Sequence, residues 1–159
     1  MSAAVLTRRE AEFAKNHRTV KPLAARLTEM EVRRRAAPIL RAHPTLIPAG
    51  WLWRGNAKLR GETFDYAQVR TAMLFFQVFG RRRRTFNSKS WSYGLKHSAE
   101  HWGACYETYG LTSYVSNGAL ILAALILGYE FKQSYGSGPN CEFNIGFGRG
   151  VLLPYLSRL

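Results

Sequence analysis

A run of nine consecutive apolar residues constrains the fold more than any other feature of the chain. Residues 119–127 read Ala-Leu-Ile-Leu-Ala-Ala-Leu-Ile-Leu. A helix that crosses a membrane needs roughly 18 apolar residues, so this run is too short and we expect no membrane partner. Ser116 can cap a helix before the run, and Gly128 can end it. The sequence therefore predicts a helix over residues 116–127 that other elements cover on every side.

Capping patterns and prolines predict two helices near the N-terminus. Thr7 and Glu10 have the spacing of a capping box, which predicts a short helix to about residue 16. A second helix is expected from Thr19, with an apolar stripe that ends at Met30. Pro38 lacks the amide hydrogen that a helix interior needs, so we expect a kink or break there.

Apolar spacing predicts two more helices in the middle of the chain. Residues 64–79 are expected to form a buried helix, although the pattern alone does not exclude a core strand. Thr63 can cap this helix, and Gly80 can end it in the left-handed conformation. Apolar residues then recur at helical spacing from Leu95 to Trp102, which predicts a helix to about residue 106.

Two hairpins are expected besides these helices. The pair Gly55-Asn56 follows two tryptophans and is typical of a tight turn. Glycines at 136 and 138 separate residues 129–135 from 141–147 and predict a second hairpin. We therefore expect an α+β fold, a mostly helical single domain with one or two short β-hairpins. Residues 1–50 would be a basic helical N-terminal segment, and residues 51–159 a compact α+β core.

The positive charge of the chain is unevenly distributed. There are 23 Lys and Arg against 10 Asp and Glu, which gives a net charge of +13. Residues 1–60 hold 13 basic and 4 acidic side chains, residues 61–100 hold 7 and 3, and residues 101–159 hold 3 and 3. The excess lies entirely in the first 100 residues. It indicates an anionic partner, either nucleic acid or the acidic surface of a nucleoprotein complex.

Arginines and tryptophans within this basic part are the candidate partner-binding residues. The planar fork of arginine donors suits phosphate, and tryptophan rings can stack on unpaired bases. The tryptophans can instead pack in the core, and the arginine run can instead be a solvated loop that grips an acidic protein. The candidates are Arg33, Arg34, Arg35, Trp51, Trp53, Arg54, Lys58, Arg60, Arg81, Arg82, Arg83 and Arg84.

A histidine pair gives an alternative function. His97, Glu100 and His101 match the His-x-x-Glu-His arrangement of inverted zinc peptidases, in which a glutamate beside two metal-binding histidines activates water. Cys105 extends the same helix face by one turn. Because so short a pattern arises readily by chance, we expect no metal, no cofactor and no catalytic residue. His97, His101 and Cys105 are the candidate ligands of the alternative, a zinc-dependent hydrolase.

A second alternative is a winged-helix DNA-binding regulator. Two helices and a hairpin over residues 90–147 follow the element order of that class. A recognition helix must present polar side chains to base edges, however, and residues 119–127 are all apolar. The core interpretation of this helix is therefore favoured over DNA recognition.

Five short strings follow one another in the second half of the chain. They are Ser92-Tyr93-Gly94-Leu95-Lys96-His97, then 114–121 (Tyr-Val-Ser-Asn-Gly-Ala-Leu-Ile), Leu127-Gly128-Tyr129, Gly138-Pro139-Asn140 and Phe143-Asn144-Ile145. Together they resemble a pattern in small uncharacterised proteins carried by bacterial phages, plasmids and integrated elements. The resemblance covers residues 81–147 and supplies no catalytic residues. It implies a mobile-element setting, in which small basic proteins act on host nucleic acid or on a defence nucleoprotein.

Together these features predict a basic, non-enzymatic binding protein. Its partner would be nucleic acid or a host nucleoprotein complex, and inhibition of a host defence system would fit the mobile-element setting. The first residues carry charges where a secretion signal needs an apolar stretch, and the two cysteines lie far apart. We therefore expect the protein in the cytoplasm of a bacterial host cell.

Overall fold

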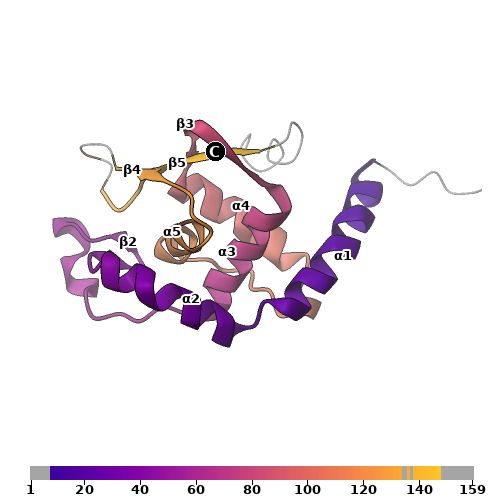
Figure 1. The fold of residues 1–159 in the computed structure, drawn as a ribbon, viewed down its shortest axis with the longest axis horizontal. Helices are drawn as coiled ribbons and strands as arrows, with labels where there is room; N and C mark the ends of the chain where they lie inside the picture. The colour runs from indigo at the N-terminus through magenta and orange to yellow at the C-terminus, as the bar shows by residue number, and fades with distance from the viewer. Residues whose placement is uncertain (1–7, 134–135, 137, 148–159) are drawn as a thin grey trace, which may run out of the picture.

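The chain folds as a mostly helical α+β domain, which confirms the predicted fold class. A computed structural model of the chain describes residues 8–133, 136 and 138–147. The elements, in chain order, are α1 (Arg8–Arg26), α2 (Glu29–Ala42), β1 (Leu46–Ile47), β2 (Gly50–Trp51), the 3-10 helix η1 (Arg54–Leu59), α3 (Tyr66–Phe79), β3 (Gly80–Trp91), α4 (Ser92–Ala104), the 3-10 helix η2 (Glu107–Tyr109), α5 (Asn117–Ile126), β4 (Phe131–Lys132) and β5 (Glu142–Phe147) (Figure 1).

Helix α5 lies at the centre of the core, as its apolar run predicts. The Ser116 hydroxyl accepts a hydrogen bond from the amide of Ala119 at 3.2 Å, and Gly128 follows the helix with φ of 78°. Residues 119–124 are fully buried, and α2, α3 and α4 pack around them. Among the described helices none combines the length and the apolar content of a membrane span. The predicted buried helix is confirmed.

Helix α5 also approaches the β1–β2 hairpin closely at its first turn. The amide of Gly118 donates to the carbonyl oxygen of Pro48 at 2.8 Å. A Cβ atom at residue 118 would lie 1.9 Å from the carbonyl oxygen of Ile47. Only glycine permits this approach, because the obstructing atoms belong to the backbone.

Helix α3 confirms the helical interpretation of residues 64–79. Its residues 69–76 are all buried, which explains why the sequence shows no polar face there. The cap is Asp65, whose carboxylate accepts from the amide of Ala67 at 2.9 Å, rather than the predicted Thr63. The predicted left-handed ending at Gly80 is wrong, since this residue has φ of −75° and ψ of 141°. Extended backbone at Gly80 leads the chain directly from α3 into β3.

The predicted boundary between the N-terminal helices is also wrong. Helix α1 continues through Pro22, and α2 continues through Pro38. The break falls at Thr28, whose hydroxyl accepts from the amide of Glu31 at 3.2 Å, so Thr28 is the N-cap of α2. Met30, which was expected on the apolar stripe, is 80% exposed. Burial of other side chains of α1 and α2 outweighs the hydrogen bonds that the prolines lack.

The first hairpin lies earlier in the chain than predicted. Leu46 pairs with Trp51 in the two-stranded antiparallel sheet of β1 and β2. The expected turn residues Gly55 and Asn56 belong instead to η1. The buried Asn56 side chain accepts from the amide of Trp53 at 2.8 Å and donates to the carbonyl oxygen of Trp51 at 3.2 Å. The Asn56 side chain thus provides partners for the amide of Trp53 and the carbonyl oxygen of Trp51 within η1 and the residues before it.

The second hairpin is confirmed and belongs to a three-stranded sheet of order β3-β5-β4. Antiparallel β4 and β5 pair Phe131 with Phe143, and the turn positions 134, 135 and 137 lie outside the described residues. The sequence did not predict β3 as a strand. Between the pairs Arg82 with Ile145 and Asn87 with Phe143, β3 advances five residues while β5 advances two. The strand therefore bulges away from the sheet after the arginine run.

The described part of residues 1–50 packs in the same core as the later elements. Its buried apolar side chains join the cluster built around α3 and α5. They are Val20, Ala24, Leu27, Val32, Ala36, Leu46 and Ile47, of which all but Ile47 belong to that cluster.

Candidate nucleic-acid interface

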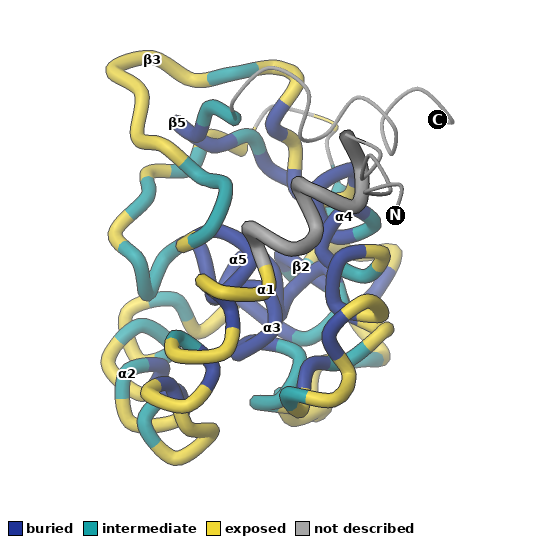
Figure 2. The backbone as a smooth tube through the Cα atoms, turned by 90° about the vertical axis from the view of Figure 1, so that its right-hand side faces the viewer, coloured by how far each residue is buried: buried dark blue, intermediate teal, exposed yellow. Residues whose placement is uncertain are grey.

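Arg81–Arg84, which we call the arginine run, occupies the first half of β3. All four residues are exposed, as the sequence predicts for a charged run that follows a buried helix (Figure 2). Arg82 donates to the carbonyl oxygen of Gly128 and lies over the Tyr129 ring at 5.7 Å from its centroid. Within the described ranges no carboxylate forms an ion pair with the run. Its positive charge therefore faces solvent without a counter-charge from those ranges.

The run distributes its charge over both faces of an edge strand. Side chains alternate along a strand, so Arg81 and Arg83 point to one face and Arg82 to the other. A Cβ atom at Gly146 would lie 3.0 Å from Cδ of Arg83, so the Arg83 stem crosses β5 at this glycine. Arg82 reaches Gly128 on the other face. The stems of Arg82 and Arg83 are therefore anchored on opposite faces of the sheet.

The arginines of α2 lie away from the arginine run, and two of them already contact other side chains. In Figures 1 and 2, β3 lies at the top and α2 at the bottom. Arg34 donates from Nε and Nη2 to the two carboxylate oxygens of Glu31, both at 2.8 Å, and this bond lowers the pKa of Glu31. Arg33 lies over the Tyr66 ring at 4.8 Å, and Arg35 is half-buried. The structure does not bring these residues together with the arginine run.

The basic residues near η1 are exposed, and the two tryptophans beside them differ. Trp51 is 4% exposed and stacks on Phe131 with ring centroids 4.6 Å apart, so the core interpretation applies to it. Trp53 is 44% exposed and is accessible to a partner. The exposed basic residues of this segment are Arg54, Lys58 and Arg60.

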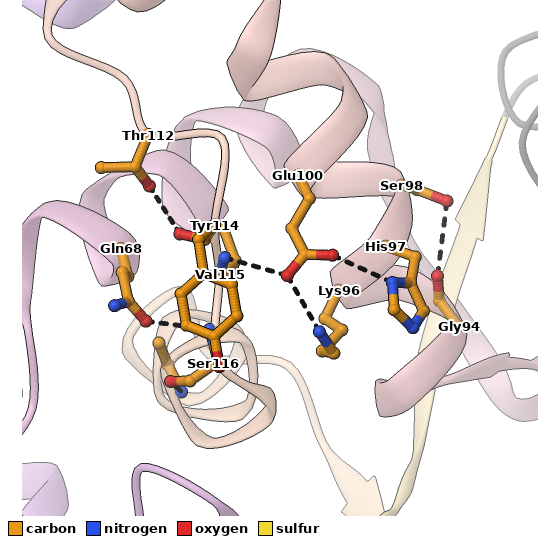
Figure 3. Close-up of polar contacts among 11 residues, drawn as sticks. Gln68, Gly94, Lys96, His97, Ser98, Glu100, Thr112, Tyr114, Val115 and Ser116 are labelled. Atoms are coloured by element: carbon orange, nitrogen blue, oxygen red, sulfur yellow. Dashed lines mark hydrogen bonds and ion pairs between the residues drawn. The ribbon is translucent and has the colours of Figure 1, made fainter.

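A buried ion pair on α4 was not predicted from the sequence. Lys96 donates from Nζ to Oε1 of Glu100 at 2.9 Å, and the amide of Val115 donates to the same oxygen at 3.1 Å. Oε2 of Glu100 lies 2.9 Å from Nδ1 of His97 (Figure 3). The side chains of Lys96 and Glu100 are only 11% and 15% exposed. Glu100 thus fixes the loop before α5 to α4.

The contacts of Glu100 concern the zinc-hydrolase alternative, which needs this glutamate beside His97 and His101. Both carboxylate oxygens of Glu100 already have partners, so the glutamate is not free to activate water. His101 and Cys105 are exposed, and Sγ of Cys105 donates to the carbonyl oxygen of His101 at 3.4 Å. No group of three or more His, Cys, Asp or Glu side chains in the described part of the chain is placed to hold a metal ion.

Two exposed tyrosine rings lie next to Lys96 and an exposed tryptophan lies next to one of them; we call Trp91, Tyr93 and Tyr114 the aromatic patch. The Lys96 ammonium lies 5.5 Å from the Tyr93 ring centroid and 5.4 Å from that of Tyr114. Trp91 and Tyr93 have ring centroids 5.7 Å apart. No spacing rule in the sequence joins Tyr114 to the other two rings. The strings 92–97 and 114–121, which carry the resemblance, meet at this patch.

The burial of α5 bears on the winged-helix alternative. Residues 117–124 are all buried, so this part of the helix presents no side chain to a DNA groove. The described structure is thus an α+β domain with an arginine-bearing edge strand and a buried central helix. Comparison with protein-family models, curated proteins and solved structures finds no match to this chain.

Proposed function

We propose that this protein binds the phosphate backbone of nucleic acid, free or within a nucleoprotein complex, without chemistry of its own. The observation that carries the proposal is the arginine run, which presents four exposed guanidinium groups with no carboxylate partner among the described residues. Guanidinium is weakly hydrated and presents donors in a planar fork that fits phosphate oxygens. Such groups bind phosphate through charge-assisted hydrogen bonds.

The extended run favours a polyanion over a single small anion. Side chains alternate along a strand, so the four guanidinium groups are distributed over both faces of β3. Together they can contact several phosphates of one backbone.

A mobile-element setting in a bacterial cytoplasm is a further part of the proposal. It is supported by the resemblance of residues 92–97 and 114–121 to proteins of phages, plasmids and integrated elements. In that setting the target would be host nucleic acid or a defence nucleoprotein, and binding would inhibit the defence system.

The test replaces Arg81, Arg82, Arg83 and Arg84 with glutamine and measures binding of a labelled oligonucleotide over a range of salt concentrations. The parent is expected to lose affinity with log-log slope of about −0.9 per neutralised phosphate on duplex DNA. The variant is expected to bind about tenfold more weakly or worse, with a shallower slope. Its melting temperature should stay nearly unchanged, because the run is exposed.

The matched control replaces Arg33, Arg34 and Arg35 on α2, which also removes neighbouring positive charges but far from β3. This variant should retain most of the affinity. Equal binding by the β3 variant and the parent, or salt-insensitive binding, contradicts the proposal. Negligible affinity of the parent for nucleic acid at low salt would mean that the basic surface serves an acidic protein.

A further inference from the structure

The arginine run and two rings of the aromatic patch, Trp91 and Tyr93, lie on one continuous stretch of chain. β3 begins with the run and ends at Trp91, and α4 starts directly after it with Ser92 and Tyr93. Between them β3 is exposed at Phe86 and Lys89. At about 3.3 Å per residue, the backbone from Arg84 to Trp91 spans at most roughly 23 Å. A short oligonucleotide can reach from the run to the rings.

The rings of the patch are exposed but held in place. Trp91, Tyr93 and Tyr114 are 40%, 43% and 59% exposed. The Trp91 indole lies over the first turn of α4, where a Cβ atom at Gly94 would lie 2.7 Å from its Nε1. Tyr93 meets the His97 ring edge-on with centroids 4.8 Å apart. Such preorganisation lowers the entropic cost of binding to the rings.

The buried charges beneath the tyrosine rings are paired with each other. Lys96 places an ammonium group next to both tyrosine rings, and Glu100 neutralises it from the buried side. Both oxygens of Glu100 are occupied by Lys96, Val115 and His97, so the carboxylate presents no free face to a phosphate. The Lys96–Glu100 pair thus adds no net charge beneath the tyrosine rings, and Glu142, which pairs with Trp91 across the sheet, is half-buried. The rings lie next to a strongly positive strand.

From these contacts we infer that the bound nucleic acid is single-stranded. This inference rests on the proposed function. The phosphates lie along Arg81–Arg84, and unpaired bases stack on Trp91, Tyr93 and Tyr114. In a duplex the base faces are covered by their neighbours, so only a single strand can use both surfaces. Stacking on rings tolerates any base, so binding has little dependence on sequence. Single-stranded DNA and RNA share this chemistry.

The experiment measures the anisotropy of labelled oligonucleotides of about 20 residues, a length that exceeds the usual site of about 4 to 16 nucleotides. The probes are oligo-dT, oligo-U, an abasic strand with the same phosphates, and a duplex. The parent is expected to bind the single strands at least tenfold more tightly than the abasic strand, since each stacked base contributes to affinity. Oligo-dU, which differs from oligo-U only in the sugar, assigns any preference between DNA and RNA.

A pair of matched variants assigns the effect to the rings. Replacing Tyr93 and Tyr114 with alanine should weaken single-strand binding about tenfold and change duplex binding less than about twofold. Replacing both with phenylalanine keeps the rings and should restore binding. Met30→Ala, which removes an exposed apolar side chain from α2, should leave all of these affinities unchanged.

The outcomes separate this inference from the proposed function. If the abasic strand or the duplex binds as tightly as oligo-dT, the single-strand inference is overturned, whereas loss of binding in the arginine variant still supports the backbone proposal. If the arginine variant binds every probe as the parent does, the backbone proposal itself fails. The abasic comparison uses only the parent protein, so it decides the question even if the alanine variant does not fold.

Discussion

Arg70 donates from Nε to the carbonyl oxygen of Leu27 at 2.6 Å, across 43 positions of the sequence. Its Nη2 donates to the carbonyl oxygen of Ala24 at 2.7 Å, and Nη1 donates to that of Gly110 at 3.0 Å. Burial lowers the pKa of this guanidinium, and the charge of Glu29 opposes the shift. One side chain of α3 thus satisfies carbonyl groups at the end of α1 and in the loop after η2.

Replacing Arg70 with methionine should destabilise the fold. The change leaves buried carbonyl oxygens without donors, and each such loss costs about 1–3 kcal/mol. We expect Arg70→Lys to recover part of the stability, because its ammonium can donate to some of the same carbonyls. Urea denaturation measures both variants. A methionine variant as stable as the parent would show that water replaces the guanidinium.

Removing the charge of Glu100 should destabilise the fold, because the Lys96 side chain is largely buried. Glu100→Gln leaves the ammonium without its counter-charge in a largely buried position, which should lower the free energy of unfolding by roughly 1–3 kcal/mol. The matched control is Glu31→Gln, which breaks an ion pair with Arg34 on the exposed face of α2. The control should leave the denaturation midpoint nearly unchanged. Equal effects of the two substitutions would contradict a special role for the buried pair.

Alanine at residue 118 should separate α5 from the β1–β2 hairpin. The added Cβ would meet the carbonyl oxygens of Ile47 at 1.9 Å and of Pro48 at 2.7 Å, neither of which can rotate away. Overpacking of this kind costs about 1–3 kcal/mol or more. Gly61→Ala is the control, since a Cβ there has nothing within 4 Å. Thermal melting should rank Gly118→Ala well below the parent and Gly61→Ala level with it.

The two thiols should differ sharply in reactivity. Burial raises the pKa of the Cys141 thiol from its ordinary value of 9.0 to about 12, and Glu142 adds to the shift. Because the thiolate is the reactive form, Cys141 should resist a thiol reagent at about pH 8, whereas exposed Cys105 should react. Titration with Ellman's reagent should count one thiol in the native protein and two after denaturation. Two rapid equivalents in the native protein would refute the burial of Cys141.

The same shift has a consequence for stability at alkaline pH. The folded state holds the Cys141 proton more tightly than the unfolded chain, which loses it near pH 9.0. The contribution of the neutral thiol to stability is therefore complete below pH 9.0 and is lost as the pH rises toward about 12. Cys141→Ala should flatten this part of the stability profile.

The sequence predicts best those elements whose local signals agree with their burial. The apolar run, with Ser116 before it and Gly128 after it, defines α5 in full, and the glycines at 136 and 138 mark the second hairpin. The helix boundary expected between residues 16 and 19 is absent and α2 continues through Pro38, because side-chain packing outweighs a local propensity against helix. The cap at Thr28 was available from its spacing to Glu31.

The candidate interface is only partly visible in the sequence. Exposure of the arginine run follows from its charge, but the pairing of β3 with β5 depends on residues about 60 positions apart. The sequence predicts an exposed Lys96 on a helix. In the fold its side chain is largely buried, because the loop at Val115 packs against Glu100. Tyr114 comes near Tyr93 because the same fold places both rings next to the Lys96 ammonium. Long-range contacts of this kind leave no periodic signal in the sequence.

The position of the arginine run at the edge of its sheet also affects how copies of the protein meet one another. The order β3-β5-β4 leaves the outer backbone groups of β3 unpaired within the described residues, and an open edge can template a strand from a second molecule. Four like charges on that edge repel such an approach. A bound polyanion or high salt screens them, so we expect any pairing of two copies through β3 to be weaker in the free protein at low salt than after the charge is neutralised.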